Sequence, residues 1–141
     1  MQLELLDSLS LPGDPTKPNE DSFAAISRMA AVFDGATGLG ELLMPGKSDA
    51  QWIAQFAARR LRAHAELGDA PREWLRAAAR DTEKSFTALR RRPPQAQYEI
   101  AFASMMMAAL DGERLALLWL GDCAALVRSP GGVLQIAGET M

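Results

Sequence analysis

The first third of the chain contains short apolar runs bounded by turn residues, a pattern typical of β-strands. Leu3–Leu11 mixes apolar and polar positions and predicts a first strand. Phe23–Ile26 and Met29–Phe33 are two further runs, separated only by Ser27 and Arg28. A two-residue connection of this kind joins antiparallel strands. We therefore expect a tight hairpin over these two runs.

The middle of the chain contains two stretches in which apolar residues recur at helical spacing. The first begins after Ser48 or Asp49, both good N-cap residues, and is expected to stop at Gly68. The second begins near Pro71 and ends before Pro93, since proline suits a first turn but not a helix interior. The positions expected to face the core are Trp52, Ile53, Phe56, Ala57, Leu61 and Leu67 in the first helix, and Trp74, Leu75, Ala78, Thr82, Phe86 and Leu89 in the second.

The last third predicts a β-meander. Tyr98–Leu110 is one strand, and Asp111-Gly112 predicts a type I′ hairpin turn. Leu115–Leu120 is almost continuously apolar, which favours a strand buried on both sides. Ala125–Val127 is expected to pair back, and Val133–Ile136 to start a further strand. The order of strands, helices and strands predicts an α+β fold: a mostly antiparallel β-sheet sandwich with a pair of antiparallel helices on one face.

Composition restricts the classes of protein to which this chain belongs. A length of 141 residues predicts a single domain over residues 1–141. The net charge of −3 argues against a nucleic-acid-binding protein, and no apolar run is long enough to cross a membrane. The N-terminus lacks the basic region of a secretory signal, and the single cysteine excludes an internal disulfide, so we expect a cytoplasmic protein. The arginine surplus of residues 59–92 is either a solvated helical face or a docking surface.

Two acidic motifs flank the predicted hairpin. Asn19-Glu20-Asp21 precedes its first strand, and Asp34-Gly35 follows its second. Antiparallel pairing would bring Glu20, Asp21 and Asp34 together at one edge. Crowded carboxylates repel one another unless a cation lies between them. Oxygen ligands of this kind suit Mg²⁺ or Mn²⁺, so the sequence predicts a divalent-metal site.

A third motif, Gly121-Asp122, follows a later apolar strand. Asn-Glu-Asp, then Phe-Asp-Gly, then Gly-Asp is a motif order that resembles the metal-dependent protein phosphatases, the protein phosphatase 2C family. The flanking segments Leu9–Gly13 and Ala36–Gly40 fit as well. The resemblance extends from about Leu9 to about Leu134, and it implies a phosphatase 2C-like fold.

The resemblance also implies roles for individual residues. Asp34 would bridge two divalent ions, and the backbone carbonyl of Gly35 would face one of them. Glu20 would hold water on the second ion, Asp21 would support the ligands through hydrogen bonds, and Asp122 would help hold an additional, weaker ion. The implied activity is hydrolysis of phosphoserine or phosphothreonine in a phosphoprotein with two Mg²⁺ or Mn²⁺ ions per complete site. Metal-activated water would be the nucleophile, with no catalytic side chain.

The sequence departs from the family pattern at three places. Thr16 stands where the family has a phosphate-binding arginine, leaving Lys17 next to it as a weaker phosphate contact. Cys123 and Ala124 replace the usual Ser-Arg after the third motif. After Ile136 we find neither of the two further metal-binding aspartates of the family. We therefore expect an incomplete domain that lacks its C-terminal portion.

These departures leave alternatives open. The chain is either the N-terminal part of a metal-dependent phosphatase or a non-catalytic regulatory or interaction module on the same scaffold, a pseudophosphatase. An unrelated small α+β domain with chance motifs is a third interpretation. The uncovered strand edges of a half-domain predict either a homodimer or association with the missing half. His64 and Cys123 are expected to be packing residues rather than ligands or nucleophiles.

Overall fold

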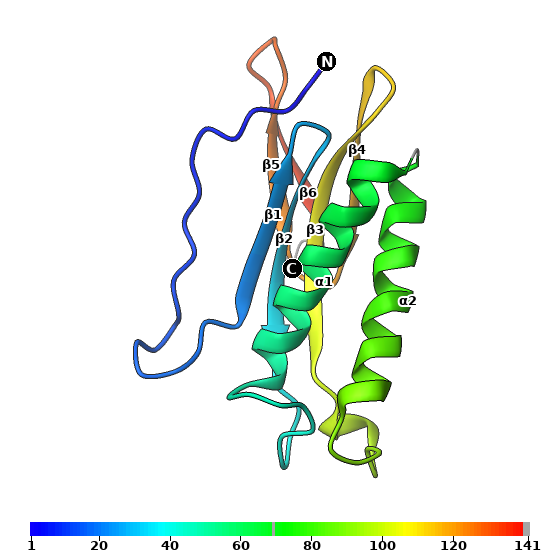
Figure 1. Ribbon diagram of the computed structural model, residues 1–141. Coiled ribbons are helices and arrows are strands. Elements are labelled where there is room, and N and C mark those ends of the chain that lie inside the picture. Colours follow the sequence, from blue (N-terminus) through cyan, green and yellow to red (C-terminus); the bar gives the residue numbers. More distant parts are fainter. Residues whose placement is uncertain (69, 140–141) are drawn as a thin grey trace.

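The structure of the protein, a computed structural model, describes residues 1–68 and 70–139. Its elements are β1 (Asp21–Ile26), β2 (Met29–Ala36), α1 (Asp49–Leu67), α2 (Pro71–Leu89), the 3₁₀ turn η1 (Gln97–Glu99), β3 (Phe102–Asp111), β4 (Arg114–Leu120), β5 (Ala124–Arg128) and β6 (Leu134–Gly138). Strands β1-β2-β3-β4 form one antiparallel sheet in that order, and β5 and β6 pair in a second. The two helices lie side by side on one face of the larger sheet, and β5–β6 lies behind it (Figure 1). The predicted α+β fold is therefore confirmed.

The first hairpin forms as the sequence predicts. Ser27 and Arg28 make the turn, and Ile26 pairs with Met29 beside it. The pairing continues without a bulge to Asp21 opposite Asp34 at the far end. The register of the hairpin thus brings the first and second motifs together.

Helix α1 packs against the sheet through small side chains. The Ser48 hydroxyl accepts a hydrogen bond from the Gln51 N–H at 3.1 Å and caps the helix, as expected. The buried apolar positions of α1 are Ala50, Ala54, Ala58, Leu61 and Ala65. The predicted stripe was therefore wrong at Leu67, which is exposed, while Trp52 and Phe56 are half-buried and stack on each other with ring centroids 5.0 Å apart. Alanines allow the helix axis to approach the strands closely.

Helix α2 follows its prediction more closely. Trp74, Ala78 and Thr82 are buried, whereas Leu89 at the C-terminus is half exposed. Gly68 ends α1, and its N–H bonds the His64 carbonyl at 2.8 Å. A Cβ at Gly68 would lie 2.7 Å from the Trp74 ring, so the glycine is needed for the second helix to pack beside the first.

Three predictions were wrong: the strand over Leu3–Leu11, the start of β3, and the type of the β3–β4 turn. The predicted strand Leu3–Leu11 is irregular, with one backbone bond, from the Leu3 N–H to Ser27 O at 2.7 Å, joining it to the hairpin turn. Strand β3 begins at Phe102 because η1 occupies the preceding residues. At the β3–β4 turn, Gly112 has φ +64° and Glu113 has no positive φ. A type I′ turn needs positive φ at both central residues, so the geometry is that of type II′.

The C-terminal strands also differ from the meander. Strand β4 is an edge strand, and Leu115, Trp119 and Leu120 are each more than two-fifths exposed. Apolar side chains lie on both faces of β4, yet no described strand pairs with its outer edge. Strand β5 pairs with β6 and not with β4. The chain therefore leaves the first sheet after the third motif and starts another.

The core lies between the larger sheet and the helices. It contains Met29, Phe33, Leu61, Trp74, Met105 and Met107 among its larger side chains. The side chains of the β3 methionines fill irregular space, as expected for this residue type. Neither described helix combines the length and the apolar composition needed to span a membrane.

Candidate metal site

Asp21 and Asp34 face each other across the end of the first hairpin. They are direct partners in the β1–β2 register. Both project from the sheet face opposite the helices, since the neighbouring Phe33 is buried in the core on the helix side. Partial desolvation raises the pKa of Asp34, and the Asp21 carboxyl raises it further through its charge and through a shared hydrogen bond. The pair is thus arranged to repel when both groups are ionised.

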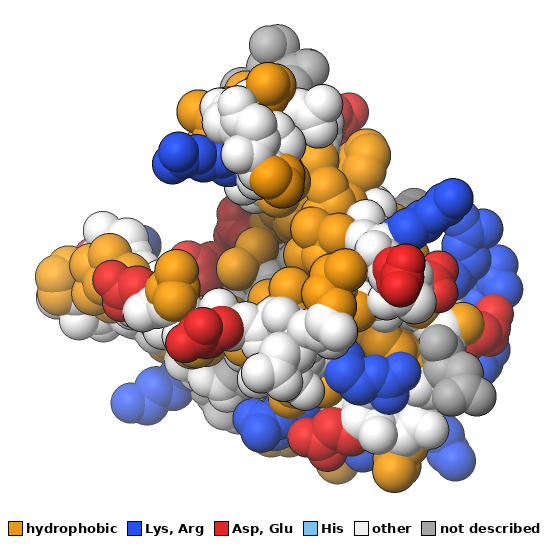
Figure 2. Space-filling view, turned by 90° about the horizontal axis from the view of Figure 1, so that it is seen from above, with side chains coloured by type: hydrophobic (Ala, Val, Ile, Leu, Met, Phe, Trp, Pro, Cys, Tyr) orange, Lys and Arg blue, Asp and Glu red, His pale blue; other side chains and the backbone are white. Residues whose placement is uncertain are grey.

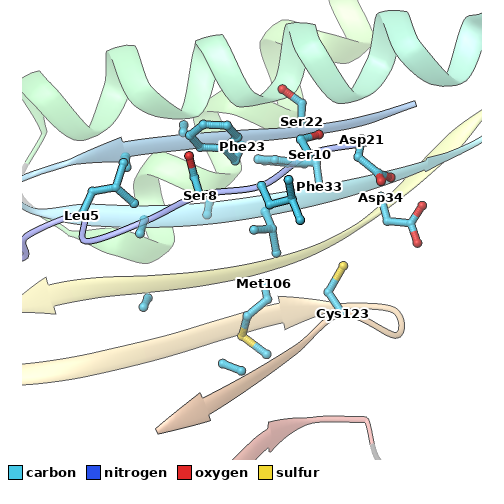
Figure 3. Close-up of a pocket in the computed structure, with 18 of the residues that line it drawn as sticks. Leu5, Ser8, Ser10, Asp21, Ser22, Phe23, Phe33, Asp34, Met106 and Cys123 are labelled. Atoms are coloured by element: carbon cyan, nitrogen blue, oxygen red, sulfur yellow. The ribbon is translucent and has the colours of Figure 1, made fainter. Parts of the chain in front are cut away.

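The two aspartates lie at one end of a trough of about 570 Å³ on this outer face. The walls are mostly apolar and include Leu5, Leu9, Phe23, Val32 and Met106. Figure 2 shows the hollow from above, with hydrophobic side chains around it and acidic side chains deep inside. Figure 3 shows the Asp21 and Asp34 carboxylates together at the end of the trough, with Cys123 below them.

The third motif reaches the same end of the sheet. Gly121 has φ +76°, and a Cβ there would lie 2.4 Å from the Ser104 hydroxyl. Ser104 in turn is the β3 partner of Asp34. The exposed Asp122 therefore sits near Asp34, and its charge contributes to the raised pKa of that residue. All three motifs converge on one edge.

Cys123 is the next residue and turns toward the pair. Burial raises the pKa of its thiol, and the charges of Asp34 and Asp122 raise it further. The thiol is therefore neutral near pH 7. This environment agrees with the expected packing role and gives no sign of an activated nucleophile.

Glu20 belongs to the first motif but points elsewhere. Its Oε2 accepts hydrogen bonds from the Thr37 hydroxyl at 2.6 Å and from the Ser48 hydroxyl at 3.1 Å. Successive residues of an extended chain project to opposite sides, so Glu20 turns toward the start of α1 while Asp21 turns to the outer face. Nothing in the sequence pattern pointed to these two hydroxyls: Ser48 was expected only as a helix cap, and Thr37 lies in the segment Ala36–Gly40, which was noted only for flanking the second motif.

Gly35 is fixed by close packing. Its N–H donates to the Glu20 carbonyl at 3.0 Å. A Cβ at this position would lie 2.5 Å from the Ala50 carbonyl oxygen and 2.7 Å from the Glu20 carbonyl oxygen. The second motif therefore requires glycine because the first turn of α1 and the first motif both contact its backbone.

The remaining candidate residues lie farther from this pair. Thr16 donates both its N–H and its hydroxyl to the Asp14 carboxylate, at 2.9 and 2.8 Å, within a turn. Lys17 is exposed in the same turn, where its N–H bonds the Asp14 carbonyl. Within residues 1–68 and 70–139, no three His, Cys, Asp or Glu side chains gather closely enough to hold a metal ion. The structure thus brings Asp21 and Asp34 together, places Asp122 nearby, and directs Glu20 to α1.

Comparisons with known proteins agree with this arrangement of motifs. The serine/threonine phosphatase PstP of Mycobacterium tuberculosis has a similar fold, with a TM-score of 0.64 at 19% identity. The PPM Ser-Thr phosphatase MsPP of Mycobacterium smegmatis, solved in complex with cacodylate, gives a TM-score of 0.62 at 18% identity. Each alignment covers 94% of this chain but only 52% and 50% of the two phosphatases, so the chain spans about half their length. No curated protein sequence matches it.

The sequence profile described as protein phosphatase 2C matches residues 15–141, which is most of the chain and includes all three motifs. The chain therefore belongs to the protein phosphatase 2C family.

Proposed function

We propose that this chain provides part of a divalent-metal site for the hydrolysis of phosphoserine and phosphothreonine in a phosphoprotein. The observation that supports it best is the Asp21–Asp34 pair. Like charges directly opposite each other on a sheet destabilise it. Among the described residues, no arginine, lysine or histidine forms an ion pair with either carboxylate. A bound cation would remove this repulsion.

The donor set fits Mg²⁺ or Mn²⁺. Asp34 and Asp21 would hold the ions through carboxylate oxygens, with the Gly35 carbonyl and Asp122 as further oxygen donors. Glu20 would act through a water molecule. When bound, such ions lower the pKa of water and stabilise negative charge on phosphate. Further oxygen donors would come from water or from another polypeptide segment.

The chain's own residues would shape the site around the phosphate. The apolar trough borders one side of the Asp21–Asp34 pair. Lys17 provides a positive charge on the exposed turn before the first motif, and we assign it a weak phosphate contact. A lysine ammonium acts as a point charge, whereas an arginine guanidinium can donate two hydrogen bonds to one phosphate. We therefore expect weak phosphate binding.

A second candidate function is a non-catalytic regulatory or interaction module on the same scaffold. The observation that favours it is the scarcity of ligands: within the described part of the chain, only two carboxylates meet closely, and the Glu20 carboxylate is engaged by two hydroxyls. Two carboxylates are too few to hold two ions firmly. Metal affinity therefore separates the two candidates.

The test is a calorimetric Mn²⁺ titration of the 141-residue chain, combined with hydrolysis of p-nitrophenyl phosphate and of matched phosphothreonine and phosphotyrosine peptides. We expect weak Mn²⁺ binding, slow or unmeasurable turnover by this chain alone, and preference for phosphothreonine where turnover is measurable. Asp34→Asn should abolish binding, whereas Glu4→Gln, on the exposed N-terminal segment and outside the trough, should leave it unchanged. Absence of Mn²⁺ binding by the wild-type chain would favour the non-catalytic module.

A further inference from the structure

A cluster of hydrogen bonds around Glu20 joins three segments that are distant in sequence. Glu20 lies just before β1, Thr37 just after β2, and Ser48 just before α1. Both hydroxyls donate to the same atom, Glu20 Oε2, at 2.6 and 3.1 Å. One carboxylate oxygen thus connects the first motif, the loop after the second motif, and the start of α1.

The surrounding backbone keeps this cluster together. The Gly35 N–H bonds the Glu20 carbonyl at 3.0 Å, and there is no room for a side chain between Gly35, Glu20 and the Ala50 carbonyl. Ser48 is itself buried. Its hydroxyl accepts from the Gln51 N–H, so its single proton is committed to Glu20. The Ser48 hydroxyl therefore cannot leave the carboxylate without disturbing the helix start.

We propose that Thr37 and Ser48 are positioning residues, which hold the Glu20 carboxylate in one orientation beside the acidic site. This inference rests on the proposed function, because Glu20 has a use there only if a cation binds Asp34. Two donors on Oε2 fix the plane of the carboxylate, and no described residue donates to Oε1. Oε1 is then the oxygen left to receive a water molecule of the site.

The first experiment measures orientation without metal. NMR three-bond couplings between Hα and Hβ of Glu20 should show one rotamer in the wild-type chain and averaged rotamers in Thr37→Val. Thr37→Ser, which keeps a hydroxyl, should restore the single rotamer. Thr87→Val makes the same chemical change on an exposed position of α2 and should have no effect. Unchanged Glu20 couplings in Thr37→Val combined with Ser48→Ala would overturn the proposal, whether or not the chain binds metal.

The second experiment separates the two roles of Ser48. Aspartate keeps the oxygen that caps α1 but has no proton to donate to Glu20. If Ser48 positions Glu20, Ser48→Asp should lower Mn²⁺ affinity, and Ser48→Thr should preserve it. We expect a loss of about 10- to 100-fold for Thr37→Val combined with Ser48→Asp, the size found for residues that support metal ligands. Full Mn²⁺ affinity in the combined variant would overturn the proposal. Wild-type binding that does not respond to Asp34→Asn would instead refute the proposed function.

Discussion

Replacing Asp34 with asparagine should stabilise the metal-free chain at pH 7. Asparagine has nearly the same shape, but it removes one of two negative charges that are direct cross-strand partners. A directly opposed cross-strand pair changes the free energy of unfolding by roughly 0.2–1 kcal/mol relative to a pair of alanines, and two like charges lower it. Because both aspartates remain exposed, solvent screening keeps the effect near the middle of that range, at about 0.5 kcal/mol. For a domain of this size that corresponds to a rise in Tm of about 2 °C.

Mn²⁺ should reverse the order of stability. Binding to the folded wild-type chain at ten times the dissociation constant adds about 1.4 kcal/mol of stability, or roughly 5 °C in Tm. The Asp34→Asn variant should gain little from the ion. Thermal unfolding followed by circular dichroism, with and without Mn²⁺, measures both effects, and Glu4→Gln, outside the trough, serves as the charge-matched control. A lower Tm for Asp34→Asn without metal would show that the two carboxylates do not repel, and it would refute the reasoning.

The pH dependence of this difference gives an independent check. The folded state raises the pKa of Asp34, so the folded chain binds a proton more readily than the unfolded chain. The unfavourable contribution of Asp34 is therefore complete above the raised pKa and is lost as the pH falls toward the unfolded value of about 3.9. The advantage of Asp34→Asn should shrink over this range. A constant advantage between pH 7 and pH 3.5 would contradict the assignment of the effect to ionised Asp34.

Three further predictions concern stability and can be measured by urea unfolding. Gly35→Ala should destabilise the chain by about 3 kcal/mol or prevent folding, since its Cβ would meet the Ala50 carbonyl, while Gly13→Ala, which meets nothing within 4 Å, should be neutral. Asp49→Ala should cost about 3 kcal/mol, because the buried Asp49 carboxylate accepts the N–H groups of residues 43 and 44, and a near-neutral result would mean that water replaces it. Asp81→Asn should lower the free energy of unfolding by about 0.5 kcal/mol above pH 4, because hydrogen bonds from the side chains of residues 64 and 60 lower the pKa of Asp81. This difference from the wild-type chain should vanish as the pH falls through the lowered pKa of Asp81. A difference that persists in strong acid would refute the cause.

The sequence alone determined the local elements whose signals are contained in a few adjacent residues. Ser27 and Arg28 between two apolar runs specify a hairpin, and its length sets Asp21 opposite Asp34. Ser48 and Pro71 mark the starts of the helices because capping and the fixed φ of proline are local properties. The order of the three acidic motifs was enough to indicate the family.

Only the tertiary structure decided the contacts between elements, such as the partners of a side chain and the buried face of a helix. The sequence predicted that Glu20 would gather with Asp21 and Asp34, whereas in the folded chain its side chain accepts hydrogen bonds from Thr37 and Ser48. The stripe predicted for α1 was right at Leu61 and wrong at Leu67, and the other buried apolar positions of α1 are alanines, whose small side chains allow close packing against the sheet.

The position of a strand within its sheet is likewise not encoded in its own residues. The apolar run of β4 would suit a central strand, yet β4 lies at an edge, and β5 pairs with β6 in another sheet. A strand can form similar backbone hydrogen bonds with many partner strands, so its own residues do not determine which strand it pairs with. The sequence therefore determined the acidic pair and its hairpin, whereas the folded chain decided which side chains surround them.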